Sequence, residues 1–248
     1  LMILLKFYEE YEEKRILLLS FLKERFPSIT SILYCINNKG NDSIYDQDIF
    51  CFYGQNHITE HLGKLQFKIT AKSFYQTNPK QAETLYAVGK RFANLKGTET
   101  VYDLYTGTGT IALYIADQCA KVIGVESVPE AIDAAKENAI FNKIKNTCFE
   151  VGDMKDCFND EFIERHGKAD VVVTDPPRNG MHIDVVNQLL KLAPKKIVYI
   201  SCNSATQARD LELMKNDYSV LKSQAVDMFP QTHHVENVVL LQRNEINE

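Results

Sequence analysis

The chain has 248 residues, of which 45% are hydrophobic and 25% are charged, and its formal net charge is −5. A chain of this length can bury a sizeable core in one large domain, with or without a small appendage. The acidic balance argues against a polyanion-binding surface spread over the whole molecule, although it leaves room for a local basic channel.

No apolar run approaches the roughly 18 residues that a membrane-spanning helix needs. The opening segment LMILLKF is too short, and too soon followed by acidic residues, to be a secretory signal. We therefore predict a cytoplasmic protein with no membrane partner. Because the chain starts with Leu1 and this segment looks like a strand without its neighbours, we also expect a fragment of a longer protein.

Six cysteines show no C-x-x-C pair and no spacing typical of a zinc site or a disulfide framework, so we expect no metal. We interpret the first five as reduced core residues: Cys35, Cys51, Cys119, Cys148 and Cys157. Cys202 differs, because an apolar strand-like run, KIVYIS, delivers it into a loop of small polar residues.

Residues 1–78 have the pattern of a small α+β appendage. The segment YEEYEEKRILLLSFLKERFPSI is helical in pattern and stops at Pro27. Three strand candidates follow, separated by Asn, Gly and Asp turn residues: SILYCINN, SIYDQDIFCFYG and KLQFKITAKSFYQTN.

Strands and helices alternate in residues 79–248, after a helix capped by Asn78 with Pro79 at its first position. This alternation predicts an α/β domain with a parallel sheet covered by helices on both faces. The predicted strands are TVYDLY, KVIGVE, TCFEVG, DVVVTD and KIVYIS, and the helices are 111–118, 129–141, 156–166 and 183–193. The tail adds two strands, YSVLKSQAVDMF and VENVVLLQR, with no clear helix between them, which predicts an antiparallel hairpin at one sheet edge.

Ligands of open α/β sheets bind at the carboxyl ends of the strands, so the residues there matter most. The first strand ends in DLYTGTGT, where Gly107 and Gly109 allow a tight turn and close approach to a ligand. The block is not a full G-x-G-x-x-G, because Ala112 occupies the third position.

Acidic residues end the next three strands: Glu126, about 20 residues after the glycines, then Asp153 and Asp175. Clustered carboxylates repel one another unless a ligand uses them. An acidic edge without a basic phosphate cradle suits the cationic S-adenosylmethionine better than NAD or ATP. We therefore predict a seven-strand, Rossmann-like methyltransferase sheet.

Asp175 and Cys202 end adjacent strands in this arrangement, so they should lie side by side. A thiolate that attacks carbon 6 of a pyrimidine makes carbon 5 nucleophilic enough to accept a methyl group. A base must then remove the carbon 5 proton, and Glu236 at the start of the last strand is the candidate. His233 and His234 precede it, and we expect them to have a structural or gating role.

The chain resembles the RNA 5-methyluridine methyltransferases over nearly its whole length, through five blocks in order: SFYQTN, DLYTGTGT, DPPRNG, SCNSATQARD and FPQTHHVE. The resemblance implies that Cys202 is the nucleophile and Glu236 the proton acceptor. It assigns S-adenosylmethionine contacts to Gln76, Tyr105, Glu126 and Asp175; Asp103, Gly107 and Gly109 would shape the cofactor loop, and Asp153 would lie near the adenine. Thr110 departs from the Asn that many relatives carry.

The resemblance also implies an RNA partner that presents its uridine in a loop or flipped out. We expect ribosomal RNA rather than transfer RNA, and a monomer. Relatives usually carry an N-terminal oligonucleotide-binding barrel, and some an iron-sulfur cluster; neither is visible here.

Simpler interpretations stay open for several residues: a turn former for Gln76, core packing for Tyr105, a helix cap for Asp153, a strand terminator for Asp175 and a surface charge for Glu236. Arg178 suits a carboxylate partner, an RNA phosphate contact or a plain surface charge. Four other functions compete: a cytosine-5 methyltransferase, which usually has a cysteine where Arg178 stands, an amino-group methyltransferase, a nonenzymatic RNA-binding subunit and a nicotinamide oxidoreductase.

Overall fold

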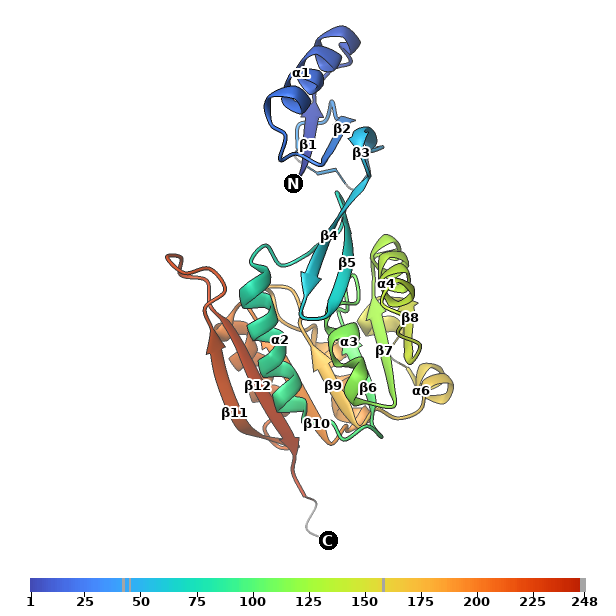
Figure 1. Cartoon of the computed structure of the whole chain (residues 1–248). Coiled ribbons are helices and arrows are strands. Elements are labelled where there is room, and N and C mark those ends of the chain that lie inside the picture. Colours follow the sequence, from blue (N-terminus) through green and yellow to red (C-terminus); the bar gives the residue numbers. More distant parts are fainter. Residues whose placement is uncertain (42, 45, 158, 246–248) are drawn as a thin grey trace. The chain divides into compact units, whose positions relative to one another are not determined.

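The computed structural model of the chain describes residues 1–41, 43–44, 46–157 and 159–245. Two compact units can be distinguished (Figure 1): Leu1–Glu60 with Phe67–Tyr75, and His61–Gln66 with Gln76–Glu248. The expected domain boundary after residue 78 stays a prediction, because compactness alone does not show that either part folds independently.

The first unit contains a three-stranded sheet of β1 (Met2–Phe7), β2 (Ser31–Ile36) and β3 (Phe50–Gly54), in that order. β1 runs parallel to β2, and β3 runs antiparallel to it. Helix α1 (Glu12–Arg25) ends before Pro27, as predicted, and buries Leu19 against Ile32 of β2. The strands β4 (His57–Leu62) and β5 (Leu65–Thr70) pair as a separate hairpin, of which β4 was not predicted.

Two of the cysteine predictions need correction. Cys35 and Cys119 are buried, as expected, but Cys51 is exposed and Cys148 is only half-buried. Both lie on edge strands, β3 and β8 (Thr147–Val151), which have a neighbour on one side only. The side chain of Cys157 lies outside the described part of the structure.

The second unit is built on a seven-stranded sheet of order β11-β12-β10-β9-β6-β7-β8. Five strands are parallel, while β12 runs antiparallel to both β10 and β11, which confirms the predicted sheet and its terminal hairpin. The bounds of the strands not yet given are β6 (Thr100–Leu104), β7 (Lys121–Glu126), β9 (Val171–Thr174), β10 (Lys196–Ser201), β11 (Tyr218–Val226) and β12 (Glu236–Arg243).

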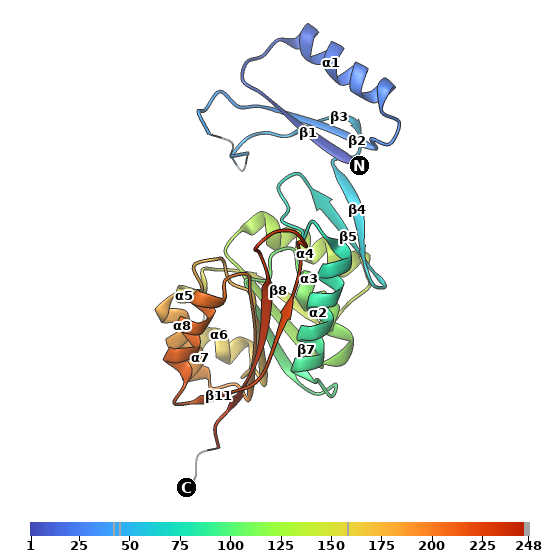
Figure 2. The ribbon, with the colours of Figure 1, turned by 90° about the vertical axis from the view of Figure 1, so that its left-hand side faces the viewer.

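Helices cover both faces of this sheet, as Figure 2 shows. One face carries α2 (Pro79–Ala93), α3 (Thr110–Ile115) and α4 (Pro129–Phe141), with a short 3-10 turn at Ala116–Gln118. The other face carries α5 (Met154–Cys157), α6 (Asp160–His166), α7 (Ile183–Leu192) and α8 (Ser204–Met214). The predicted cap of α2 is confirmed, because the Asn78 side chain accepts a hydrogen bond from the backbone N–H of Gln81.

Two helix predictions were wrong. The expected helix 156–166 is divided into α5 and α6, with residue 158 between them outside the described residues, and Asn159 caps α6 by accepting from the N–H of Phe162. The segment after Cys202 is helix α8 rather than a loop: the side chain of Asn203 accepts from the N–H groups of Ala205 and Thr206 and so starts the helix.

The core lies between the sheet and its helices. The central strands are apolar on both faces, as expected for parallel strands covered on each side, and Tyr102, Ile123, Val172 and Tyr199 are almost fully buried. None of the helices in the described residues has the length and apolar character that crossing a membrane would require.

Candidate active site

The chain changes direction at the middle of the seven-stranded sheet. From β6, the next two strands along the chain, β7 and β8, lie to one side, whereas β9 and β10 lie to the other. The helices that follow β6 and β9, α3 and α7, therefore lie on opposite faces of the sheet. This switch point is where open α/β sheets bind ligands, and the predicted site residues follow these strands.

The glycine block forms the turn between β6 and α3. Tyr105, Gly107 and Gly109 all have positive φ, at 63°, 54° and 80°. A Cβ at Gly109 would approach Ala135 and Phe149 to 3.0 Å, so this glycine allows close packing of the turn. A Cβ at Gly107 would meet no atom within 4 Å. Gly107 therefore borders open space that a ligand can enter.

Asp103, the last residue but one of β6, supports this turn from below. Its Oδ2 accepts from the hydroxyl of Thr106 at 2.6 Å and from the N–H of Ala112 at 3.0 Å. Its Oδ1 is buried and has no hydrogen-bond partner among the described residues. Burial raises the pKa of Asp103 to about 7, and the charge of Glu126 adds to the increase. A buried acceptor without a donor can bind a cationic ligand or accept a hydrogen bond from a ligand.

Glu126 ends β7 beside the glycine turn. Its Oε2 accepts from the N–H of Gly107 at 3.2 Å, and its Oε1 accepts from the N–H groups of Ser127 and Val128. These bonds fix the carboxylate between the glycine turn and the start of α4. Asp153, after β8, is exposed, and its Oδ1 accepts from the N–H of Lys155 in α5, which agrees with the simpler interpretation as a helix cap; its place near the adenine stays a prediction.

Asp175 follows β9 and lies within electrostatic reach of Asp103 on β6 and of Glu236 on β12. Burial raises the pKa of Asp175 well above its usual value, and the charges of Glu236 and Asp103 raise it further. Tyr105 packs against the core, and burial raises its pKa to about 12, with smaller contributions from Asp153 and other carboxylates. The interpretation of Tyr105 as a core residue is thus compatible with a place beside the carboxylate cluster.

Cys202 and Glu236 are brought together by the β10–β12 ladder. The last pair of that antiparallel ladder is Ser201 with Asn237. The next residue on each strand is Cys202 on one side and Glu236 on the other, and opposed residues of an antiparallel pair project from the same face. Glu236 is only 8% exposed, so it is not the solvated surface charge that a glutamate at a strand start would usually be.

The charges around the thiol agree with this placement. Burial raises the pKa of Cys202, and the negative charges of Glu236 and Asp175 raise it further, whereas Arg178 lowers it. Burial also raises the pKa of Glu236, against the opposing effect of Arg178. The structure thus brings Cys202, Glu236, Asp175 and Arg178 within electrostatic reach of one another. The roles of nucleophile for the Cys202 thiol and of base for the Glu236 carboxylate stay predictions that this placement allows.

Helix α8, which the sequence interpretation missed, holds the loop that carries Arg178. The side chains of Asn203 and Thr206 both donate to the Arg178 carbonyl at 3.1 Å. Buried Asp210 accepts from the N–H of Met181 at 2.8 Å and from the hydroxyl of Tyr199 at 2.7 Å. The loop between β9 and α7 is therefore tied to the helix that begins next to Cys202.

Gln207 holds the two strands that present the catalytic candidates. Its amide nitrogen donates to the carbonyls of Tyr199 on β10 and Asn237 on β12, and its oxygen accepts from the Asn237 amide. Gln207 and Asp210 are both buried and polar at helical spacing. Polar residues three apart in the segment SATQARD are the sequence feature that could have indicated a helix with these two positions on one face.

Three candidates are less tied to the site. Gln76 lies half-buried in the loop before α2, and none of the described hydrogen bonds joins it to the other candidates, so its role stays a prediction. The ring centroids of His233 and His234 lie 4.1 Å apart in the loop before β12, with the ring planes tilted by 41°. His233, the burial of the ring and Arg178 all lower the pKa of His234.

The residues at the carboxyl ends of β6, β7 and β9 fit S-adenosylmethionine. Hydrogen-bond acceptors dominate: the unpartnered Oδ1 of Asp103, the carboxylates of Glu126 and Asp175, and open space at Gly107. No Lys or Arg lies within the turn 105–109 to hold a phosphate. Acceptors of this kind suit a ligand with a sulfonium, an ammonium and ribose hydroxyls.

The comparisons agree on the class of protein. A profile of the family described as tRNA (uracil-5-)-methyltransferase matches residues 48–244. A crystal structure of the Pyrococcus abyssi tRNA (uracil-54, C5)-methyltransferase in complex with S-adenosyl-L-homocysteine superimposes with a TM-score of 0.81 and 33% identity, over 97% of this chain and 56% of that one. The chain belongs to the tRNA (uracil-5-)-methyltransferase family, which confirms the expected family and its Rossmann-like fold.

Two bacterial relatives, both named uncharacterized RNA methyltransferase, are more similar in sequence. The one from Porphyromonas gingivalis is 56% identical over 246 residues, covering 98% of this chain and 53% of the relative. The one from Bacteroides thetaiotaomicron is 58% identical over 225 residues, covering 91% and 50%. The chain thus spans about half the length of the curated relatives it matches. More distant structures, such as Trm5b from Pyrococcus abyssi (TM-score 0.66, 15% identity), share the fold.

Proposed function

We propose that the protein methylates carbon 5 of a uridine in RNA, with S-adenosylmethionine as the methyl donor and Cys202 as a covalent catalyst. The placement of Cys202 opposite Glu236, at the end of the β10–β12 ladder and beside Asp175, carries the proposal. Family membership supports the choice of uracil. The cytoplasm as the location, ribosomal rather than transfer RNA as the substrate and a monomeric state stay predictions.

The cofactor, when bound, supplies an electrophilic methyl group. Glu126, Asp103 and Asp175 are the acceptors that would hold it, with Gly107 leaving room for it. The sulfur of Cys202, as the thiolate, forms a bond to carbon 6 of the uracil, and the electron pair of the 5,6 double bond moves toward carbon 5 and the carbonyl at carbon 4. Carbon 5 thereby becomes a nucleophile.

Release of the product requires the reverse movement of electrons. Once carbon 5 carries the methyl group, Glu236 accepts its remaining proton, the 5,6 double bond re-forms and the bond between carbon 6 and sulfur breaks. The raised pKa of Glu236 makes this carboxylate a stronger base than an exposed glutamate. Arg178 opposes the negative charges around the thiol and so favours the thiolate.

The proposal is tested by mapping the product. The protein is incubated with S-adenosylmethionine carrying a labelled methyl group and, separately, with unmodified ribosomal and transfer RNA, followed by digestion to nucleosides and mass spectrometry. We expect label in 5-methyluridine, no label with Cys202→Ser, and unchanged labelling with Cys51→Ser, which alters an exposed thiol of the other unit. Label in 5-methylcytidine or in an exocyclic amino group would contradict the proposal.

A further inference from the structure

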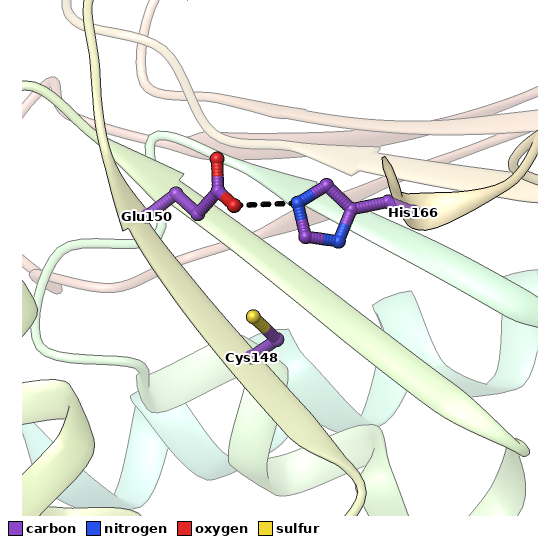
Figure 3. A group of neighbouring side chains, drawn as sticks. All are labelled: Cys148, Glu150 and His166. Atoms are coloured by element: carbon purple, nitrogen blue, oxygen red, sulfur yellow. Dashed lines mark hydrogen bonds and ion pairs between the residues drawn. The ribbon is translucent and has the colours of Figure 1, made fainter. Parts of the chain in front are cut away.

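Three side chains of different chemistry converge at the edge strand of the seven-stranded sheet, and none of them belongs to the candidate active site: Cys148, Glu150 and His166 (Figure 3). One ligand atom from each lies within 4.8 Å of the others. In the part of the chain that the structure describes, this is the one group of three or more His, Cys, Asp or Glu side chains so arranged.

The secondary structure explains the convergence. Cys148 and Glu150 are two residues apart on β8, so they project from the same face of that strand. His166 is the last residue of α6, which packs over that face, and its Nε2 lies 2.6 Å from Oε1 of Glu150. Figure 3 shows the sulfur of Cys148 directed toward the contact between carboxylate and imidazole.

Neighbouring groups hold two of these side chains in place. Arg165 donates to Oε2 of Glu150 at 2.9 Å, which leaves Oε1 facing His166 and Cys148. The His166 side chain is only 7% exposed and its ring lies 4.6 Å from that of Phe162. Although burial raises the pKa of Glu150, His166 and Arg165 lower it below its usual value, so the carboxylate is ionised at neutral pH. Metal sites commonly fix their ligands with such outer contacts.

The contact between Glu150 and His166 accounts for the placement of these two side chains, but the nearby thiol has no part in it. Thiolate, imidazole and carboxylate are all ligand types that Zn²⁺ accepts. The hard ions Mg²⁺ and Ca²⁺ prefer oxygen ligands alone. The thiolate and carboxylate would also neutralise the charge of a divalent cation.

We propose that Cys148, Glu150 and His166 form a binding site for a thiophilic divalent transition metal such as Zn²⁺, with a fourth position open to water. The cation would tie the edge strand β8 to the end of α6. The two ends of the segment between Glu150 and His166, which contains Asp153, would then be joined through the metal. This role in joining β8 to α6 does not depend on the proposed methyl transfer.

The test uses tag-free protein, freed of metal with a chelator and titrated with Co²⁺, whose thiolate bond gives an absorption band in the near ultraviolet. We expect the band to saturate at about one equivalent, Zn²⁺ to displace Co²⁺, and Zn²⁺ to raise the melting temperature. Cys148→Ser leaves Glu150 and His166 in place but should abolish the band and weaken Zn²⁺ binding at least about tenfold. Cys51→Ser, which removes an exposed thiol, is the matched control and should leave both unchanged.

His166→Gln provides a second variant, because it removes the imidazole but leaves the thiol in place. Circular dichroism of the metal-free variants verifies that each is folded. A saturating thiolate band that survives Cys148→Ser would overturn the proposal, as would folded wild-type protein that shows no band or melting shift with either metal.

Discussion

Replacing Asp103 by Asn should change both the pH dependence of stability and the affinity for the cofactor, and the two effects can be measured separately. The pKa of this buried carboxyl is raised from 3.8 to about 7. A raised folded-state pKa means that the contribution of Asp103 to stability is full below its unfolded pKa and is lost as the pH rises through about 7. The whole shift corresponds to about 4 kcal/mol, and the part lost between pH 5 and pH 8 to about 2–3 kcal/mol.

Asp103→Asn removes this titration but keeps an oxygen that can accept from Thr106 and Ala112. Urea unfolding without cofactor, at pH 5 and at pH 8, measures the difference in unfolding free energy between wild type and variant. That difference should move by about 2–3 kcal/mol in favour of the variant at the higher pH. A fixed cost of the new amide group cancels from this comparison. Parallel pH profiles of the two proteins would refute the reasoning.

The same substitution should weaken cofactor binding. A cationic ligand prefers the ionised carboxyl, so wild-type affinity for S-adenosylmethionine should fall about tenfold between pH 8 and pH 6 from this group alone. Affinity is measured by calorimetry for both proteins at each pH. Protonation of the ligand affects both proteins equally, so it cancels from the comparison. Asp103→Asn should bind less tightly and with a shallower pH dependence, and an equal slope in the two proteins would argue against contact with this carboxyl.

Four further substitutions test other parts of the site. Glu236→Gln should allow methyl transfer but slow release, so that a protein–RNA complex resistant to denaturing electrophoresis accumulates; free methylated RNA released at the wild-type rate would be inconsistent with the assigned base. Gly107→Ala and Gly109→Ala both place a side chain on backbone with positive φ, which costs about 1–2 kcal/mol at each position. Gly109→Ala should lower the melting temperature further, because its Cβ would also meet Ala135 and Phe149 at 3.0 Å, whereas a Cβ at Gly107 meets no atom within 4 Å and should weaken cofactor affinity. Thermal melts and calorimetry distinguish the two variants, and equal losses of melting temperature would count against open space at Gly107. Asp210→Ala should cost about 3–5 kcal/mol of unfolding free energy by leaving buried donors unpaired, and should lower activity at temperatures where the variant is folded; unchanged stability would show that the loop does not depend on this carboxylate.

Much of the fold follows from local patterns. The alternation of apolar strands and helices after Asn78 predicts the parallel sheet, because the central strands are apolar on both faces and the connections between parallel strands are long enough for a helix. The positions of Glu126 and Asp175 at strand ends follow directly from that sheet. The terminal hairpin also places Glu236 next to Cys202, because β12 pairs with β10. The spacing of these two residues in the sequence does not show that they are neighbours.

The missed helix α8 shows one reason why the sequence patterns failed: polar side chains occupy buried positions there. Helix α8 buries Gln207 and Asp210, so its apolar periodicity is weak, and the partners that satisfy both side chains come from distant strands. Cys51 shows the opposite case: an apolar residue is exposed because its strand lies at a sheet edge. The convergence of Cys148 and His166 depends on how α6 packs on β8, which the sequence spacing does not reveal.

The central claim is that Cys202 forms a covalent bond to carbon 6 of uracil, and RNA containing 5-fluorouridine tests it most directly. Fluorine at carbon 5 cannot leave as a proton, so the methylated adduct should persist. Mass spectrometry of the wild-type protein with S-adenosylmethionine and this RNA should reveal one covalent complex, with the modified peptide containing Cys202. Absence of an adduct with RNA that is methylated when it carries ordinary uridine, or an adduct on another cysteine, would contradict the account.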